Sequence, residues 1–127
     1  MAVEHALEKA MIEWLNKSGH YAVAVKSGMI EQLRYGYHSW VHLAPKGTPD
    51  IFACIKGKFV GIEVKKDEKE KKKWQGQVKR FEERKIVVKS SERAIAQSQT
   101  HKRIRSAGGL AFVCASIDEL KDIVRAL

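Results

Sequence analysis

The sequence predicts one α/β domain, a mixed β-sheet flanked by helices. Three observations predict the α/β class. Apolar residues recur at helical spacing near both ends of the chain, short apolar runs of strand length lie between them, and no linker-like segment divides the chain. With 127 residues, 44% hydrophobic and 31% charged, the chain has the size and composition of a single globular domain, residues 1–127.

The N-terminal third begins with a predicted helix. Val3 to Lys17 carry an apolar stripe at three- and four-residue spacing, and Gly19 follows as a stop signal. Tyr21 to Val25 form a short run typical of a strand. Ser27 to Gly47 mix glycine and proline with aromatic residues, so both a short hairpin and a long loop near a site remain open.

The centre of the chain predicts a β-hairpin followed by a charged segment. Asp50–Ile55 and Phe59–Lys65 are two apolar runs that flank the turn Lys56–Lys58, which predicts antiparallel strands. Residues 66–84 are dense in charge and fit either an exposed helix or a mobile excursion. We treat residues 66–92 as a lysine-rich insert.

The C-terminal part predicts a return to the sheet. Ile86–Val88 fits a short strand, and Glu92–Ala107 has a helical pattern that two glycines end. Leu110–Cys114 is another strand-like run. The sequence Ser116 to Glu119 is a capping box, in which the Glu119 side chain accepts from the N–H of Ser116, and it opens a helix that reaches about Ala126.

The net charge of +9 lies almost entirely in one third of the chain. Residues 64–105 hold 15 Lys and Arg against six Asp and Glu, whereas the segments on either side are nearly neutral. A positive field concentrated in this way suits a polyanion, and nucleic acid is the commonest one. A lysine-rich surface that only aids solubility is the alternative. Trp74, within the charged segment, fits either base stacking or partial burial.

Several other classes of protein are not expected. The chain has no run of 18 apolar residues and no basic-then-apolar leader, so we expect no membrane partner, no secretory signal and a cytoplasmic location. Two cysteines are too few for a disulfide framework or a zinc finger. Glycine-rich phosphate loops are missing from the sequence, which argues against a nucleotide cofactor.

Two acidic residues stand where strands rarely hold acids. Asp50 opens one apolar run and Glu63 lies inside the next. On neighbouring strands of a hairpin their carboxylates can converge on one hard cation, Mg²⁺ or Mn²⁺, with Lys65 beside it. A plain salt bridge between Glu63 and a lysine is the alternative interpretation of this pattern.

These residues carry a resemblance to a known family. Pro49-Asp50 followed by Glu63-Val64-Lys65 resembles the PD-(D/E)xK nuclease motif, and more narrowly its VRR-NUC branch, which is similar to the archaeal Holliday-junction resolvases. Lys46 to Asp50 resembles the family's turn of a basic residue, Gly, any residue, Pro and Asp. The resemblance implies a restriction-endonuclease-like core for the predicted α/β domain. The insert is a departure, because the family has a shorter connection after the Glu-x-Lys strand.

The resemblance also implies roles for individual residues. Glu8 resembles the metal-site acid of the family's opening helix, with Glu4 as a candidate second acid. It implies that Glu8, Asp50 and Glu63 bind the metal ion together with the carbonyl oxygen of Val64. Lys65 is implied to orient the nucleophile or offset negative charge, and Gln97 to support Lys65 or to touch the DNA backbone. The candidate DNA contacts are Lys46, Lys66, Lys71, Lys72, Lys73, Lys79, Arg80, His101 and Lys102.

The predicted function is therefore metal-dependent cleavage of branched DNA, foremost a four-way junction. Two symmetric cuts need two sites, so we expect a C2 homodimer. Three alternatives stay open: a restriction-like, nicking or flap nuclease of phage or mobile-element type, a catalytically silent DNA-binding module, and an RNA-binding protein.

Overall fold

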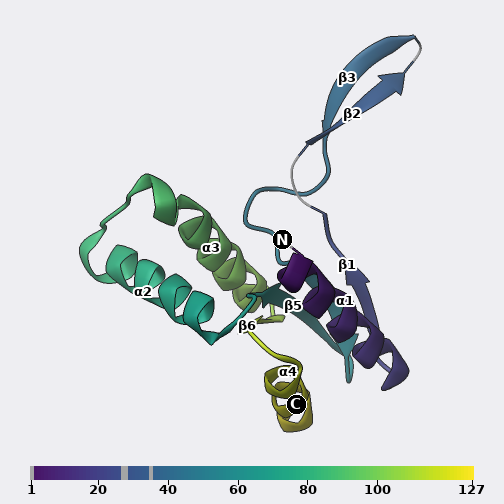
Figure 1. The fold of residues 1–127 in the computed structure, drawn as a ribbon, viewed down its shortest axis with the longest axis vertical. Helices are drawn as coiled ribbons and strands as arrows, with labels where there is room; N and C mark the ends of the chain where they lie inside the picture. Colours follow the sequence, from purple (N-terminus) through teal and green to yellow (C-terminus); the bar gives the residue numbers. More distant parts are fainter. Residues whose placement is uncertain (1, 27–28, 35) are drawn as a thin grey trace.

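The computed structural model describes residues 2–26, 29–34 and 36–127. Its main sheet has the strand order β1-β4-β5-β6, antiparallel except for the parallel pair of β5 and β6, and β2 and β3 form a separate antiparallel pair (Figure 1). This confirms the predicted α/β fold with a mixed sheet. The elements are α1 (Ala2–Lys17), β1 (Tyr21–Ala24), β2 (Met29–Arg34), β3 (Tyr37–His42), β4 (Ile51–Ile55), β5 (Lys58–Val64), α2 (Glu68–Arg84), the short 3₁₀ helix η1 (Lys89–Ser91), α3 (Glu92–Ser106), β6 (Leu110–Cys114) and α4 (Ile117–Ala126).

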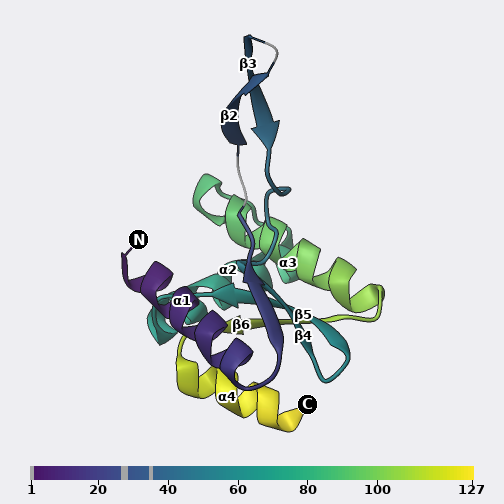
Figure 2. The same cartoon turned by 90° about the vertical axis from the view of Figure 1, so that its right-hand side faces the viewer.

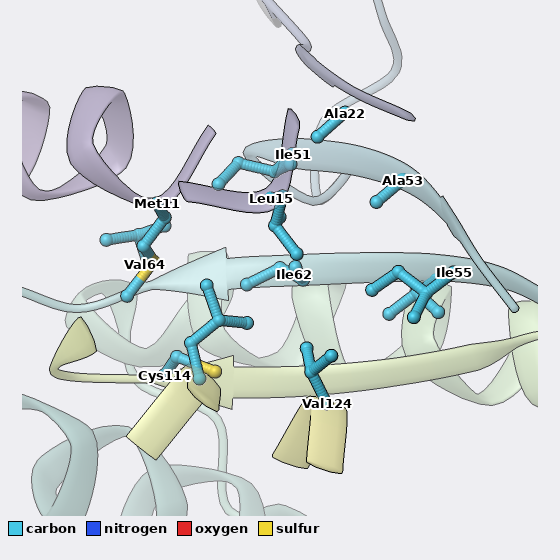
Figure 3. Packing of buried hydrophobic residues seen from close by; sticks show 12 residues of the cluster. Met11, Leu15, Ala22, Ile51, Ala53, Ile55, Ile62, Val64, Cys114 and Val124 are labelled. Atoms are coloured by element: carbon cyan, nitrogen blue, oxygen red, sulfur yellow. The ribbon is translucent and has the colours of Figure 1, made fainter. Parts of the chain in front are cut away.

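Helices cover both faces of the main sheet. Helices α1 and α4 pack on one face, α3 packs on the other, and α2 lies against α3 (Figure 2). The main core lies under α1 and α4, where Met11 and Leu15 meet alternate residues of β4 and β5, among them Ile51 and Ile62 (Figure 3). Since Ile62 faces this core, Glu63 points to the opposite face, toward α3.

The predicted β4–β5 hairpin is confirmed, but its turn has two residues, Lys56 and Gly57, because Lys58 already pairs with Ile55 as part of β5. Lys56 and Gly57 both have positive φ, 51° and 78°, which is the backbone of the tight turns that suit twisted strands. The pairing aligns Ile51 with Ile62, so Asp50, one residue before β4, comes opposite Glu63. The turn therefore fixes which residues meet at the far end of the hairpin.

The segment Ser27 to Gly47 contains a hairpin. Strands β2 and β3 pair from Met29 with His42 to Arg34 with Tyr37. The pair extends away from the main sheet (Figures 1 and 2). Residues 27, 28 and 35 of this segment lie outside the described part of the chain.

The charged segment forms a regular helix. Asp67 caps α2 by accepting a hydrogen bond from the N–H of Glu70 at 2.8 Å, and Lys85 ends the helix in the left-handed conformation with φ of 56°. The predicted strand at Ile86–Val88 is wrong. These residues are exposed, join α2 to η1 and pair with no described strand, because the main sheet lies at the other end of the helices.

The start of α4 differs from the prediction in one detail. Ser116 accepts a hydrogen bond from the N–H of Glu119 as expected, but Glu119 accepts from the N–H of Ala115 rather than from that of Ser116. Its second carboxylate oxygen pairs with Lys71 of α2. Within the described residues, every helix is too short or too polar to cross a membrane.

Candidate active site at the end of the hairpin

Two carboxyl groups meet where β4 begins and β5 ends. Asp50 Oδ2 accepts a hydrogen bond from the backbone N–H of Val64 at 2.8 Å, which holds the Asp50 side chain against β5. Its carboxyl group also hydrogen-bonds the Glu63 carboxyl group. The two acids that the sequence places on neighbouring strands are therefore in direct contact.

Glu63 is buried in an environment that disfavours its negative charge. Its side chain is 1% exposed, and Oε1 has no hydrogen-bond partner among the described residues. Burial, followed by the hydrogen bond to Asp50 and the charge of Asp50, raises the pKa of Glu63 to about 10. A buried carboxyl oxygen without a partner beside a second carboxylate is costly unless a cation binds there, so these residues fit a divalent metal ion.

Glu8 approaches this pair from α1. Burial and, second, the charge of Asp50 raise the pKa of Glu8, which places it in the electrostatic reach of Asp50. Glu4, one turn earlier, adds to the same effect. Across the described ranges, however, no three His, Cys, Asp or Glu side chains are grouped closely enough to hold a metal ion. The structure thus presents two carboxyl groups in contact and a third nearby.

Lys65 lies beside the acids and is held from α3. Its Nζ donates to Gln97 Oε1 at 3.4 Å. Gln97 is 2% exposed, which favours the predicted support of Lys65 over the predicted contact with the DNA backbone. The carbonyl oxygen of Val64 as a metal ligand stays a prediction, since the contact described for Val64 is made by its N–H.

The position of His101 disfavours the predicted contact with DNA. The side chain is 1% exposed, its Nε2 lies 3.7 Å from Glu63 Oε1, and its ring packs against Trp74 with centroids 5.6 Å apart. Burial and the positive charges of Arg105 and Lys65 lower the pKa of His101 to about 4, so the imidazole is neutral. It closes the site from the side of α3 without supplying a charge.

The candidate DNA contacts differ in their exposure. Lys71 is mostly buried and paired with Glu119, which disfavours a contact with DNA. Lys102 Nζ lies 3.2 Å from Glu82 Oε1 but its side chain stays exposed. Lys66 is half-buried. The exposed positions are Lys46, Lys72, Lys73, Lys79 and Arg80.

A pocket beside the acids contains Arg93, which the sequence did not predict as a site residue. The pocket has a volume of about 220 Å³. Its lining contains three cations, Lys65, Lys66 and Arg93, and two acids, Glu4 and Glu70. Arg93 lies one helical turn before Gln97 on α3, and that spacing was the signal that could have found it. The pocket therefore presents cations next to the carboxyl pair.

One solved structure shares this architecture. It is described as a "VRR_NUC domain" and superposes with a TM-score of 0.56, covering 97% of this chain and 95% of that chain at 18% identity. The chain has the fold of a VRR_NUC domain. No family model and no curated protein sequence matches it. In this VRR_NUC fold the two carboxyl groups, Lys65 and the cationic pocket lie together at one end of the main hairpin.

Proposed function

We propose that the protein is a metal-dependent nuclease that hydrolyses phosphodiester bonds in DNA. The contact of half-buried Asp50 with buried Glu63, whose Oε1 has no partner among the described residues, carries this proposal. Acids beside a basic surface repel DNA unless a cation lies between them, and a module that only binds DNA has no need of them. The likeness to a VRR_NUC domain supports the same interpretation.

The residues at the site divide the work of hydrolysis. Asp50 and Glu63 would hold Mg²⁺ or Mn²⁺, and Glu8 on α1 lies within the electrostatic reach of Asp50. When bound, the metal ion supplies an acidified water and a polarised phosphate. Asp50 is kept in place by the N–H of Val64, and the Lys65 ammonium, held by Gln97, offsets the negative charge that develops on the phosphate.

The proposed substrate is branched DNA, foremost a four-way junction cut by a C2 homodimer. The exposed cations of α2 lie on a helix that stands outside the main sheet, where they can contact backbone at a distance from the cut (Figure 1). Such contacts bind phosphates without reading sequence, which suits recognition of DNA shape.

Cleavage of labelled DNA tests the proposal. A four-way junction, a flap and a linear duplex of the same sequence are incubated with Mg²⁺, Mn²⁺ or EDTA. We expect metal-dependent cutting of the junction and none in EDTA. Equal cutting of the linear duplex would move the assignment to a general nuclease, preference for the flap to a flap nuclease, and binding without any cutting would refute the catalytic proposal.

Metal binding is expected to release a proton near neutral pH. Since the pKa of Glu63 is raised to about 10, its carboxyl group is protonated at pH 7 and must lose the proton to coordinate a cation. Titration calorimetry in two buffers of different ionisation enthalpy should give close to one proton released per metal ion, and affinity should increase with pH.

The matched variant for that measurement is Glu63→Gln. It is isosteric and carries no exchangeable carboxyl proton, so any metal that still binds should release none. A wild-type heat that does not depend on the buffer would contradict the prediction.

A further inference from the structure

Trp74 links the charged helix α2 to the candidate site. Its indole Nε1–H donates to Gln97 Oε1 at 2.7 Å, and its ring packs on His101. The inner side of α2 is fastened on both sides of Trp74, through Lys71 to Glu119 and through Gln77, whose Nε2 donates to the carbonyl of Ser90 at 3.3 Å. Trp74 therefore lies on the face of α2 that Lys71 and Gln77 fasten to the rest of the domain, and this fixes the position of its ring.

One oxygen of Gln97 receives two donors. Gln97 Oε1 accepts from Trp74 and from the Nζ of Lys65, and Gln97 itself is 2% exposed. An amide side chain can turn over and present its NH₂ group in place of its oxygen, whereas an indole N–H can only donate. Trp74 therefore selects the orientation of Gln97 that offers an oxygen to Lys65. In the reversed orientation the Gln97 NH₂ group would face the Lys65 ammonium, and these two donors cannot form a hydrogen bond with each other.

We propose that Trp74 is a positioning residue for Lys65 that acts by fixing the orientation of the Gln97 amide. This inference rests on the proposed nuclease function, in which Lys65 acts at the phosphate. It assigns the inner face of α2 a role in catalysis, while the exposed lysines on the outer face contact DNA. A role for Trp74 in base stacking is disfavoured, because its N–H and its ring are both engaged inside the protein.

Trp74→Phe is the decisive variant, because it keeps an aromatic ring against His101 and removes the N–H. We expect kcat for junction cleavage to fall about tenfold, the rate equivalent of one ordinary hydrogen bond, with the Kd for DNA in EDTA unchanged within about twofold. Trp14→Phe, in α1 on the opposite face of the sheet, is the matched control and should leave both values unchanged.

A double-mutant cycle tests whether Trp74 acts through Gln97. Because Gln97→Ala already removes the oxygen, the double variant Trp74→Phe, Gln97→Ala should cleave no more slowly than Gln97→Ala alone. Additive losses, an unchanged kcat in Trp74→Phe, or a loss confined to the Kd for DNA would each overturn the proposal.

A second readout does not depend on cleavage. The Trp74 indole proton, assigned in the NMR spectrum by its loss in Trp74→Phe, should exchange with solvent slowly in the wild type and at least about tenfold faster in Gln97→Ala. Equal exchange in the two proteins would overturn the positioning role. If the wild type cleaves no DNA while the indole proton is protected, the nuclease function is refuted and the catalytic role of Trp74 with it, whereas the Trp74–Gln97 contact stands.

Discussion

Asp50→Asn is expected to lower DNA cleavage at least about a thousandfold without unfolding the protein. The asparagine keeps a side-chain oxygen that can accept from the N–H of Val64, so the start of β4 stays fastened to β5. It removes the negative charge that a divalent cation requires beside Glu63. The bound metal ion stabilises the transition state by several kcal/mol, and losing that stabilisation lowers the rate at least about a thousandfold.

The measurement is single-turnover cleavage of the four-way junction in saturating Mg²⁺, with thermal unfolding recorded for the same sample. Asp122→Asn is the control, because Asp122 is exposed on α4 and pairs there with Arg125. It should cleave like the wild type. An Asp50→Asn protein that melts like the wild type and cleaves within about tenfold of its rate would show that Asp50 does not hold the catalytic metal.

The hairpin that carries Asp50 and Glu63 could be predicted because its information is local. Two apolar runs flank a Lys-Gly turn, and the two-residue period then fixes the face of every side chain. The predicted turn, Lys56–Lys58, is one residue longer than the observed turn, and only the observed pairing of Ile55 with Lys58 brings Asp50 opposite Glu63. The same logic holds for α1 and α4, whose apolar stripes identify the faces that pack on the sheet.

The partners of α2 could not be predicted, because they depend on contacts between distant parts of the chain. In the sequence Lys71 is one of three consecutive, equivalent lysines, yet it pairs with Glu119, 48 residues away, whereas Lys72 and Lys73 are exposed. Charge density indicates that a helix has an exposed face, but it does not identify the residues that turn inward. For the same reason, the sequence did not decide between base stacking and partial burial for Trp74.

Two other expectations depended on tertiary packing, because the residue types concerned are compatible with more than one environment. Ile86 to Val88 have strand propensity, but a strand needs a neighbour and α3 follows instead. His101 fits a DNA contact as well as a core position, and only the packing of α2 over α3 decides for the core. The type of a residue shows which secondary structures and degrees of burial it can adopt, and tertiary packing determines which of them it has in the fold.

Gly47→Ala is expected to destabilise the fold by about 2–5 kcal/mol. Gly47 has φ of +90°, and a Cβ atom there would lie 2.6 Å from the carbonyl oxygen of Ala96 and 2.7 Å from its carbonyl carbon. The left-handed backbone alone costs roughly 1–2 kcal/mol for alanine, and a clash with helix backbone adds about 1–3 kcal/mol. Urea unfolding of the variant and the wild type gives the difference.

Gly19→Ala separates the two contributions, because Gly19 has the same φ of +90° but a Cβ atom there would meet no described atom within 4 Å. It should lose only the backbone cost, so Gly47→Ala should be less stable than Gly19→Ala by at least about 1 kcal/mol. Equal losses would refute the close approach of this loop to α3. The loop ends at Asp50, three residues on, and α3 carries Gln97 directly after Ala96. A displaced loop should therefore also slow cleavage at temperatures where Gly47→Ala is still folded, whereas Gly19→Ala, remote from Asp50, should cleave at the wild-type rate.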